Sequence, residues 1–488
     1  MKLGAILNKF KFEHGSIDRH SNILPYLLVF VAGLFYVLAW NSAPIAVNDS
    51  GGYMKVAADL QDLKLDTLHG RTPGYPLLLW LTNSSEQPTR LLFFTQLLLH
   101  FTSVLLLAYL LNYMAVSKKI IALFLFIAVI PPSMVMTAYV LTETLTQFFL
   151  VAGFVFLLLG LDKSNTTLVV ISSIALSLAG FVRPTYELIF IPVLGMLLVA
   201  LCLTRKSRGL LILATFSTFA FSTIFIGGLI WHNYSNFNYS KLTPFFGYGL
   251  SSKTARFLER LPDEYTEVRE TLIRNRDRER VTYRTAWLRR PWHNSSHNGL
   301  YYIWLARPEL RKITNLSNLE LSDYMLRLNL LLIRKAPLQY LREVVVALPT
   351  YWLPITTDLS NFNSKTLQLL WAGIHFVVMV LFFSIVPILL GSGLFLFKLP
   401  VSLREKFRSR MAMNTPLFLL SSLLAFAIIG YTMLISVAAD VGNPRHRVPT
   451  DLLIFFVIAL GIHCWLHLRD NLLEKKHLPV RDSNLVEF

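Results

Sequence analysis

The sequence predicts an all-α polytopic membrane protein with about ten transmembrane helices. Of its 488 residues, 54% are hydrophobic and only 15% are charged, and the mean hydropathy is +0.51. A soluble protein of this composition would leave much apolar surface in water, so lipid is the better solvent for it. In lipid, only helices and closed barrels satisfy every backbone polar group, and the apolar runs have the length of helices.

Ten apolar runs account for the predicted spans. The first, 23–40, follows a basic stretch and has no small-residue cleavage site behind it, so we interpret it as an uncleaved first span. The other nine runs lie at 91–114, 120–137, 144–161, 167–182, 186–203, 210–231, 366–397, 415–437 and 451–468.

Lysine and arginine gather in alternate connecting segments, which predicts the orientation. The basic set includes 118–119, 205–208 and 398–410, together with both ends of the chain. The positive-inside rule places that set in the cytoplasm and the segments 42–90 and 438–450 outside. The net charge of +17 therefore follows from topology, and we expect no nucleic-acid partner.

Three parts are expected along the chain. A transmembrane module covers 1–235, a long outer loop covers 236–365, and C-terminal transmembrane helices cover 366–488. The outer loop mixes acidic and basic residues at helical spacing and later alternates apolar clusters with arginines. Such patterns are typical of solvated helices and of helices lying in the membrane interface.

Polar groups stand at the predicted outer ends of several spans, in one plane outside the lipid core. They are Asp49 after the first span, Glu143, Arg183, and the basic turn Arg445, His446 and Arg447. The spans themselves carry almost no charge, with only Gln96, His100 and Gln147 as candidates, which speaks against an ion-coupled transporter. A negatively charged, lipid-linked substrate would present its headgroup in this plane.

Each of these residues also has a purely structural interpretation. Asp49 could cap the helix that follows it, and Glu143 could face the dipole of a helix capped by Thr142. Arg183 could pair with Glu187 or reach lipid phosphate. The basic turn could bind headgroups as an ordinary outer loop does.

Metal binding has weak candidates. His293 and His297 are four residues apart and could share a helix face as ligands, although Asn-Ser-Ser between them is poor helix material. The two cysteines, Cys202 and Cys464, both lie in apolar runs, so neither a disulfide framework nor a thiolate metal site is expected.

The segment "NDSGGYMKVAADL", the following "GRTPGYPLLLW" and the later "GFVRPTYE" and "GNPRHRVPTDLLIFF" together resemble the GT-C superfamily of membrane glycosyltransferases. The resemblance is to enzymes that use polyprenyl-phosphate sugars, such as aminoarabinose-lipid A transferase and protein O-mannosyltransferases. It covers the first seven spans and, more loosely, the rest. Many relatives have two adjacent acids in the first loop, where this chain has Asn48 and Asp49.

The resemblance implies a catalytic first outer loop, 42–90, with two juxtamembrane helices at 51–63 and 74–81. Asp49 would be the general base. Glu143 would position the acceptor or hold a divalent cation, Mg²⁺ or Mn²⁺. Arg183, Arg445, His446 and Arg447 would bind the donor phosphate, and Tyr53, His69 and Arg71 would line the same cavity.

The implied function is transfer of a monosaccharide from a polyprenyl-phosphate donor to a hydroxyl on a lipid, glycan or protein. The implied location is the bacterial inner membrane, with the site facing outward. Three alternatives remain open: an O-antigen-type ligase or polymerase using polyprenyl-diphosphate glycans, a lipid or solute transporter, and a structural membrane scaffold.

Overall fold

The computed structural model describes residues 24–39, 43–64, 70–203, 208–289, 302–354, 365–398 and 415–477. Regular structure in these ranges is helical, apart from one isolated parallel bridge between Ile45 and Tyr139. Six described helical stretches are long and apolar enough to cross a membrane: Arg90–Tyr113, Glu143–Asp162, Arg208–Phe237, Leu369–Leu389, Leu417–Ala439 and Pro444–His467. The protein is therefore an integral membrane protein. Length and composition give six spans rather than the expected ten in the described ranges.

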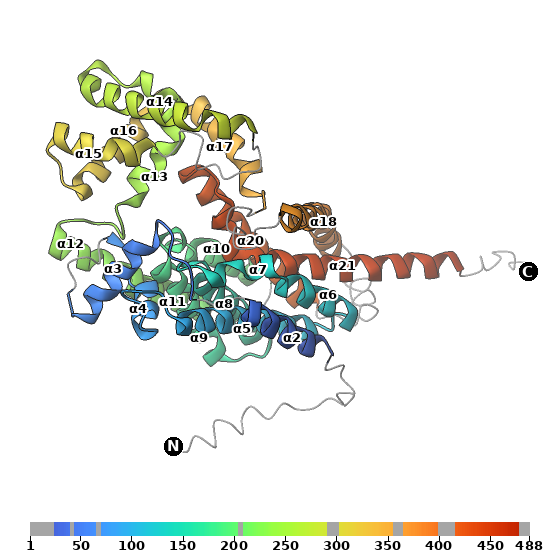
Figure 1. The fold of residues 1–488 in the computed structure, drawn as a ribbon. Helices are drawn as coiled ribbons and strands as arrows, with labels where there is room; N and C mark the ends of the chain where they lie inside the picture. The colour runs from blue at the N-terminus through green and yellow to red at the C-terminus, as the bar shows by residue number, and fades with distance from the viewer. Residues whose placement is uncertain are drawn as a thin grey trace, which may run out of the picture.

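The apolar helices form one bundle around a shared hydrophobic core (Figure 1). Its helices are α2 (Leu24–Ala39), α5 (Arg90–Tyr113), α6 (Lys118–Val129), α8 (Glu143–Asp162), α9 (Thr166–Val182), α10 (Phe190–Leu203), α11 (Arg208–Ser222), α18 (Lys365–Lys398), α20 (Thr415–Ala439) and α21 (Val448–His477). A short π-helix, η4 (Thr223–Gly227), connects α11 to α12 (Gly228–Phe237). In α8 and α21, 83% of the apolar stretch is buried, so these two helices are the centre of the bundle.

Small residues and hydroxyl groups join α8, α9 and α11. Ser172 on α9 donates to the carbonyl of Gly153 on α8 at 2.7 Å. The Oγ atoms of Ser177 on α9 and Ser222 on α11 lie 3.0 Å apart. Small residues let apolar helices approach closely in lipid, and hydroxyl groups hydrogen-bond across the contact. This hydroxyl seam fixes α9, whose end precedes Arg183.

The predicted span 120–137 is divided in the structure, which corrects that expectation. α6 ends at Val129, and the chain continues as α7 (Pro131–Met134) and η2 (Val135–Ala138). Proline cannot donate to the helix ladder and disfavours helical geometry in the residue before it. Two adjacent prolines, Pro131 and Pro132, therefore end the helix.

Polar side chains on α5 satisfy the carbonyl groups that this break leaves without helical partners. Gln96 Nε2 donates to the carbonyls of Thr137 and Tyr139 at 2.9 and 3.0 Å. His100 Nε2 lies 3.0 Å from the carbonyl oxygen of Ala128. Buried backbone groups need such partners, so Gln96 and His100 have a structural role here.

Two short helices follow α2, close to the ranges predicted for the first outer loop. They are α3 (Ser50–Gln61) and α4 (Gly74–Leu81). Tyr53 on α3 and Tyr75 on α4 meet edge to face at 5.4 Å in a small core of their own. α4 also lies against the end of α9, where a Cβ on Gly74 would come within 2.8 Å of the carbonyl oxygen of Phe181.

A second group of helices gathers at one end of the bundle (Figure 1). It comprises α13 (Phe245–Thr254), η5 (Ala255–Arg260), η6 (Asp263–Tyr265), α14 (Thr266–Arg289), α15 (Tyr302–Thr314), α16 (Asn318–Lys335) and α17 (Pro337–Tyr351). We call it the 245–351 module. It has its own hydrophobic core, built on residues such as Tyr248, Leu258, Leu310 and Leu328. Where the structure describes it, the predicted outer loop 236–365 is thus largely helical.

The module meets the bundle at the turn after α20. Gly442 in that turn has a φ of +75°, and a Cβ added there would lie 2.5 Å from the carbonyl oxygen of Ala347 on α17. Both its left-handed backbone and the close approach of α17 require glycine. The turn leads directly into η9 (Pro444–Arg447), which carries the basic residues.

We expect Gly442→Ala to lower the free energy of unfolding by about 1–3 kcal/mol, because the new Cβ meets both backbone strain and α17. Thermal unfolding in detergent would measure the change. Gly430→Ala is the matched control, because a Cβ there meets nothing within 4 Å inside α20, and helical Gly→Ala is neutral or stabilising. Equal midpoints for the two variants would contradict the interpretation.

Candidate functional site

Five side chains form a connected series of ion pairs, which we call the charge chain: Arg71, Asp49, Arg445, Glu143 and Arg183. Arg71 Nη2 donates to Asp49 Oδ1 at 3.1 Å, and Arg445 Nη2 donates to Asp49 Oδ2 at 2.8 Å. Arg445 Nε and Arg183 Nη1 each lie 2.8 Å from Glu143 Oε1. All five are site residues predicted from the sequence, and the structure brings them together.

The charge chain passes from a partly open end to a buried end. The side chain of Asp49 is 36% exposed, whereas that of Glu143 is 1% exposed. Three guanidinium groups face two carboxylates, which leaves one net positive charge. Buried charges must be paired to be stable, so this surplus favours an anionic ligand at the open end.

Backbone contacts hold the segment before Asp49 beside the broken region ahead of α8. Ile45 N donates to the carbonyl of Ala138 at 2.8 Å, and Val140 N donates to that of Ile45 at 3.0 Å. The Ser50 hydroxyl donates to the carbonyl of Val140 at 2.8 Å. The break caused by the two prolines therefore supplies the surface that positions Asp49.

Asp49 does not act as a helix cap. It precedes α3 in right-handed helical conformation, and its side chain makes no capping hydrogen bond. Burial raises the pKa of Asp49, but the charges of Arg445 and Arg71 outweigh this and lower the pKa to about 2. The carboxylate is therefore ionised at neutral pH and has both oxygens in contact with arginine.

Glu143 is the first residue of α8, and its buried carboxylate lies between two arginines. Arg183 Nη1 also donates to the hydroxyl of Thr142 at 3.3 Å. Although two guanidinium groups are close, Glu143 Oε1 and Arg445 Nε have no aligned hydrogen-bond partner. A buried donor without a hydrogen bond lowers stability. A small movement of the Arg445 side chain would allow its Nε to donate to an oxygen atom of a ligand.

Prolines orient both arginines that contact Glu143. Pro184 ends α9 and leaves Arg183 extended, with φ −139° and ψ 117°. Arg183 pairs with Glu143 rather than with Glu187, the alternative that its sequence position allowed. Arg445 follows Pro444 in η9, where the Asn443 side chain accepts from its backbone N–H at 3.0 Å.

Arg71 and Tyr53 lie together at the open end of the charge chain. The Arg71 Cζ lies 4.5 Å from the centroid of the Tyr53 ring, a cation–π distance. Next to it, Thr72 donates to the carbonyl of Val182 at 2.9 Å. The segment that carries Arg71 is thus attached to the end of α9, just before Arg183.

The side chains of the other two members of the basic turn contact residues outside the charge chain. His446 Nδ1 is 3.1 Å from Ser436 Oγ and 3.7 Å from Asp440 Oδ2. Arg447 is buried and donates to Asp451 at 2.8 Å and to the carbonyl of Tyr351 at 2.7 Å. The expected role of Arg447 in phosphate binding does not fit these contacts, because they tie the end of α17 to α21.

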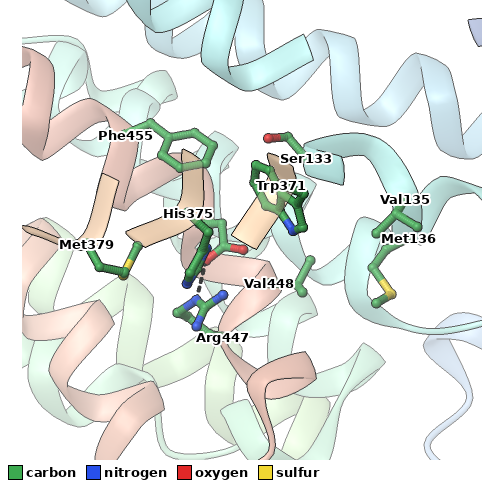
Figure 2. A pocket seen from close by; sticks show the side chains of 10 residues that line it. Ser133, Val135, Met136, Trp371, His375, Met379, Arg447, Val448 and Phe455 are labelled. Atoms are coloured by element: carbon green, nitrogen blue, oxygen red, sulfur yellow. Dashed lines mark hydrogen bonds and ion pairs between the residues drawn. The ribbon is translucent and has the colours of Figure 1, made fainter. Parts of the chain in front are cut away.

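Arg447 also lines a separate pocket (Figure 2). Trp371, His375 and Met379 of α18 line it together with Phe455 of α21. Its free space is about that of one water molecule. His375 Nε2 lies 2.8 Å from the carbonyl oxygen of Trp352, so this ring also serves packing. The pocket is too small for a sugar.

Part of the predicted metal and cavity set is not described by the structure. His69, His293 and His297 lie outside the described residues. No group of three or more His, Cys, Asp or Glu side chains suited to a metal ion occurs in the described part of the chain. Arginines contact both Asp49 oxygens and Glu143 Oε1, so the charge chain does not fit a divalent cation.

Sequence reasoning missed three residues beside the site. Asp440 directly follows α20, and burial raises its pKa against the opposing charges of Lys253 and Arg445. Burial disfavours the charged form of Lys253, on α13, and lowers its pKa to about 8. The Phe245 ring stacks on Arg71 at 4.3 Å. Asp440 could have been found, because it stands just before the basic turn; the other two depend on how α13 docks.

The arrangement suits chemistry in which negative charge develops beside fixed cations. Guanidinium groups are always protonated and present planar forks that match phosphate oxygens. Asp49, at the exposed end, is a carboxylate that a substrate can reach. An anion could enter where Arg71 and Arg445 meet Asp49.

No protein-family model matches the sequence, and no curated protein is significantly similar to it. Two solved structures are similar in fold. One is the archaeal oligosaccharyltransferase AglB from Archaeoglobus fulgidus in complex with an inhibitory peptide and a dolichol-phosphate (14% identity, TM-score 0.46, 92% of this chain and 52% of that chain). The other is the Archaeoglobus fulgidus oligosaccharyltransferase in the apo form (15% identity, TM-score 0.47, 93% and 52%). This chain spans about half their length.

We expect Glu143→Gln to destabilise the protein by about 3–5 kcal/mol, because it leaves the buried guanidinium of Arg183 without its carboxylate partner and removes one of the two carboxylates that contact Arg445. The midpoint of thermal unfolding in detergent would measure it. Glu86→Gln, at an exposed position, is the matched control. A Glu143→Gln midpoint equal to that of the control would show that the pairing is not needed.

Proposed function

We propose that the protein is a membrane glycosyltransferase of the GT-C type. It moves a monosaccharide from a polyprenyl-phosphate donor to a hydroxyl acceptor at the outer face of the membrane. The observation that carries the proposal is the charge chain: a reachable carboxylate held between arginines whose combined charge exceeds that of their partners. The donor's polyprenyl tail would lie in the bilayer, and the apolar bundle is suited to contact it.

The charge balance favours a monophosphate-linked donor over a diphosphate-linked one. A sugar joined to a polyprenyl monophosphate is a phosphodiester with one negative charge, which matches the single net positive charge of the charge chain. A diphosphate linker carries at least one more negative charge. We therefore favour the monophosphate donor, and the ligase or polymerase alternative becomes an outcome of the test.

In the proposed reaction the acceptor hydroxyl oxygen attacks the anomeric carbon, and the bond from that carbon to the phosphate oxygen breaks. The acceptor proton passes to Asp49 as general base. The bonding electrons leave with the phosphate, which becomes a monoester with one more negative charge. Arg445, with Arg71 and Arg183 nearby, stabilises that charge more in the transition state than in the donor.

Donor binding would also change the basicity of Asp49. With a pKa of about 2, Asp49 is a weak base while Arg71 and Arg445 contact it. A phosphate that draws either guanidinium away removes part of the interaction that lowers this pKa. Asp49 thus becomes a stronger base when the donor is in place, which protects the donor from reaction before it is correctly bound.

Location and acceptor follow from the same proposal. Positive residues in the alternate loops support an outward-facing site in a plasma membrane, such as the bacterial inner membrane. The acceptor is a hydroxyl group on a lipid, a glycan or a protein. His446 and Asp440, partly exposed beside the charge chain, are suited to hydrogen-bond it.

We expect Asp49→Asn to abolish transfer while leaving membrane insertion intact, because the amide cannot accept the proton. The assay uses purified protein in lipid nanodiscs and radiolabelled donors of both classes, monophosphate- and diphosphate-linked. Asp62→Asn is the control, because Asp62 is exposed at the end of α3. Transfer retained by Asp49→Asn would exclude it as the base, and wild-type transfer from the diphosphate donor alone would establish the alternative.

We expect Arg445→Ala to weaken donor binding at least about tenfold, since a charged hydrogen bond to phosphate is lost. Equilibrium binding of a labelled polyprenyl-phosphate sugar would measure it without turnover. Arg342→Ala, at an exposed position on α17, controls for loss of general surface charge. Donor affinity equal in the two variants would rule Arg445 out of the phosphate site.

A further inference from the structure

The guanidinium of Arg71 lies between two aromatic rings. Its Cζ is 4.5 Å from the centroid of Tyr53 and 4.3 Å from that of Phe245. Both distances fall well within the range of significant cation–π contacts. The same guanidinium donates to Asp49 Oδ1 at 3.1 Å, so the rings hold the group that contacts the proposed base.

The two rings come from different parts of the fold. Tyr53 belongs to α3 in the first loop, whereas Phe245 is the first residue of α13 in the 245–351 module. The module fixes this end of α13. Ser322 on α16 donates to the Pro244 carbonyl at 2.5 Å, and Asn329 donates to that of Gly247 at 2.9 Å.

The middle and the C-terminal end of α13 lie against α20 and α17, the two helices that pack on η9, the turn with Arg445. A Cβ on Gly249 would come within 3.3 Å of the Ala439 carbonyl oxygen at the end of α20. Lys253 is buried and donates to the carbonyl of Glu343 on α17 at 3.3 Å. α13 therefore connects the first loop, through Arg71, with the turn that leads to Arg445.

We propose that Phe245 is a positioning residue, which holds Arg71 against Asp49 and so makes the 245–351 module part of the active site. The proposal rests on the proposed function for its catalytic consequence, although the contact itself does not. A partly exposed ion pair contributes little by itself, because water competes for both groups and long side chains move. Contact with two rings shields the Arg71 guanidinium from water and restricts its movement, which reduces both effects.

The test compares Phe245→Ala, Phe245→Leu and Phe245→Tyr in the full-length protein, with Phe246→Ala as the matched control. Phe246 is the next residue on α13 and is 52% exposed. We expect Phe245→Ala and Phe245→Leu to lower kcat/KM for the lipid-linked donor about 3- to 30-fold, the range for a lost cation–π contact. Phe245→Tyr keeps the ring and should retain activity.

The pH profile separates positioning from packing. Arg71 helps to lower the pKa of Asp49, so loosening Arg71 raises that pKa. Asp49 must be unprotonated to act as a base, and the acid limb of kcat/KM should therefore move to higher pH in Phe245→Ala. The acid limb of Phe246→Ala should coincide with that of wild type.

A stability cycle tests the contact without turnover. If Phe245 acts through Arg71, Phe245→Ala should lower the unfolding midpoint less in an Arg71→Ala background than in wild type. Additive midpoints, or Phe245→Leu as active as Phe245→Tyr, would overturn the proposal. Absence of transfer by wild type would instead refute the proposed function, while the stability cycle would still decide the role of Phe245.

Discussion

Arg445 donates to Asp49 at 2.8 Å, and its Nε lies 2.8 Å from Glu143 Oε1, so one guanidinium joins the first loop to the start of α8. Asp49, Glu143 and Arg445 lie far apart in the sequence. Each charge is stabilised by at least one of the other two. The first loop has little hydrophobic core of its own, and Glu143 is too deeply buried to stand without cations. The position of Asp49 therefore depends on where the last helix of the bundle begins.

The irregular segments of the fold converge on this guanidinium. The paired prolines after α6, Pro184 after α9, and Gly442 with Pro444 after α20 each end a helix near the charge chain. Regular helices in lipid satisfy their backbone hydrogen bonds internally, whereas helix ends leave carbonyl groups free and carry charged side chains. The helices of the bundle therefore form the scaffold, and the segments between them carry the residues of the charge chain.

The sequence predicted most of the helices because lipid imposes length and apolarity on a span. It also identified Asp49, Glu143, Arg183 and Arg445, because charged residues at the ends of apolar runs are conspicuous. It could not assign pairs: Arg183 could have paired with Glu187, and the arginine at 447 looked equivalent to Arg445. Two residues apart in a short helical turn, these arginines point to different partners, and only tertiary packing decides which one meets Asp49.

The contact of Phe245 with Arg71 lay beyond sequence reasoning for the same reason. It requires α13 to dock on α20 and α17, and α13 approaches the end of α20 closely at Gly249. A glycine shows in the sequence, but the surface that approaches it does not. The 245–351 module therefore looked like a loop with solvated and interfacial helices, although it has its own core and reaches the charge chain.

The hydroxyl seam between α9 and α11 has a consequence for how far disturbances spread. Its Ser–Ser contacts, such as Ser177 to Ser222 at 3.0 Å, carry no formal charge. Protonation of a carboxylate or binding of an anion at the charge chain therefore does not change the charge of the groups in the seam. The contacts that hold α9, the helix before Arg183, therefore do not depend on the charges of the site. The carboxylates and arginines can exchange partners during a catalytic cycle while α9 keeps its place.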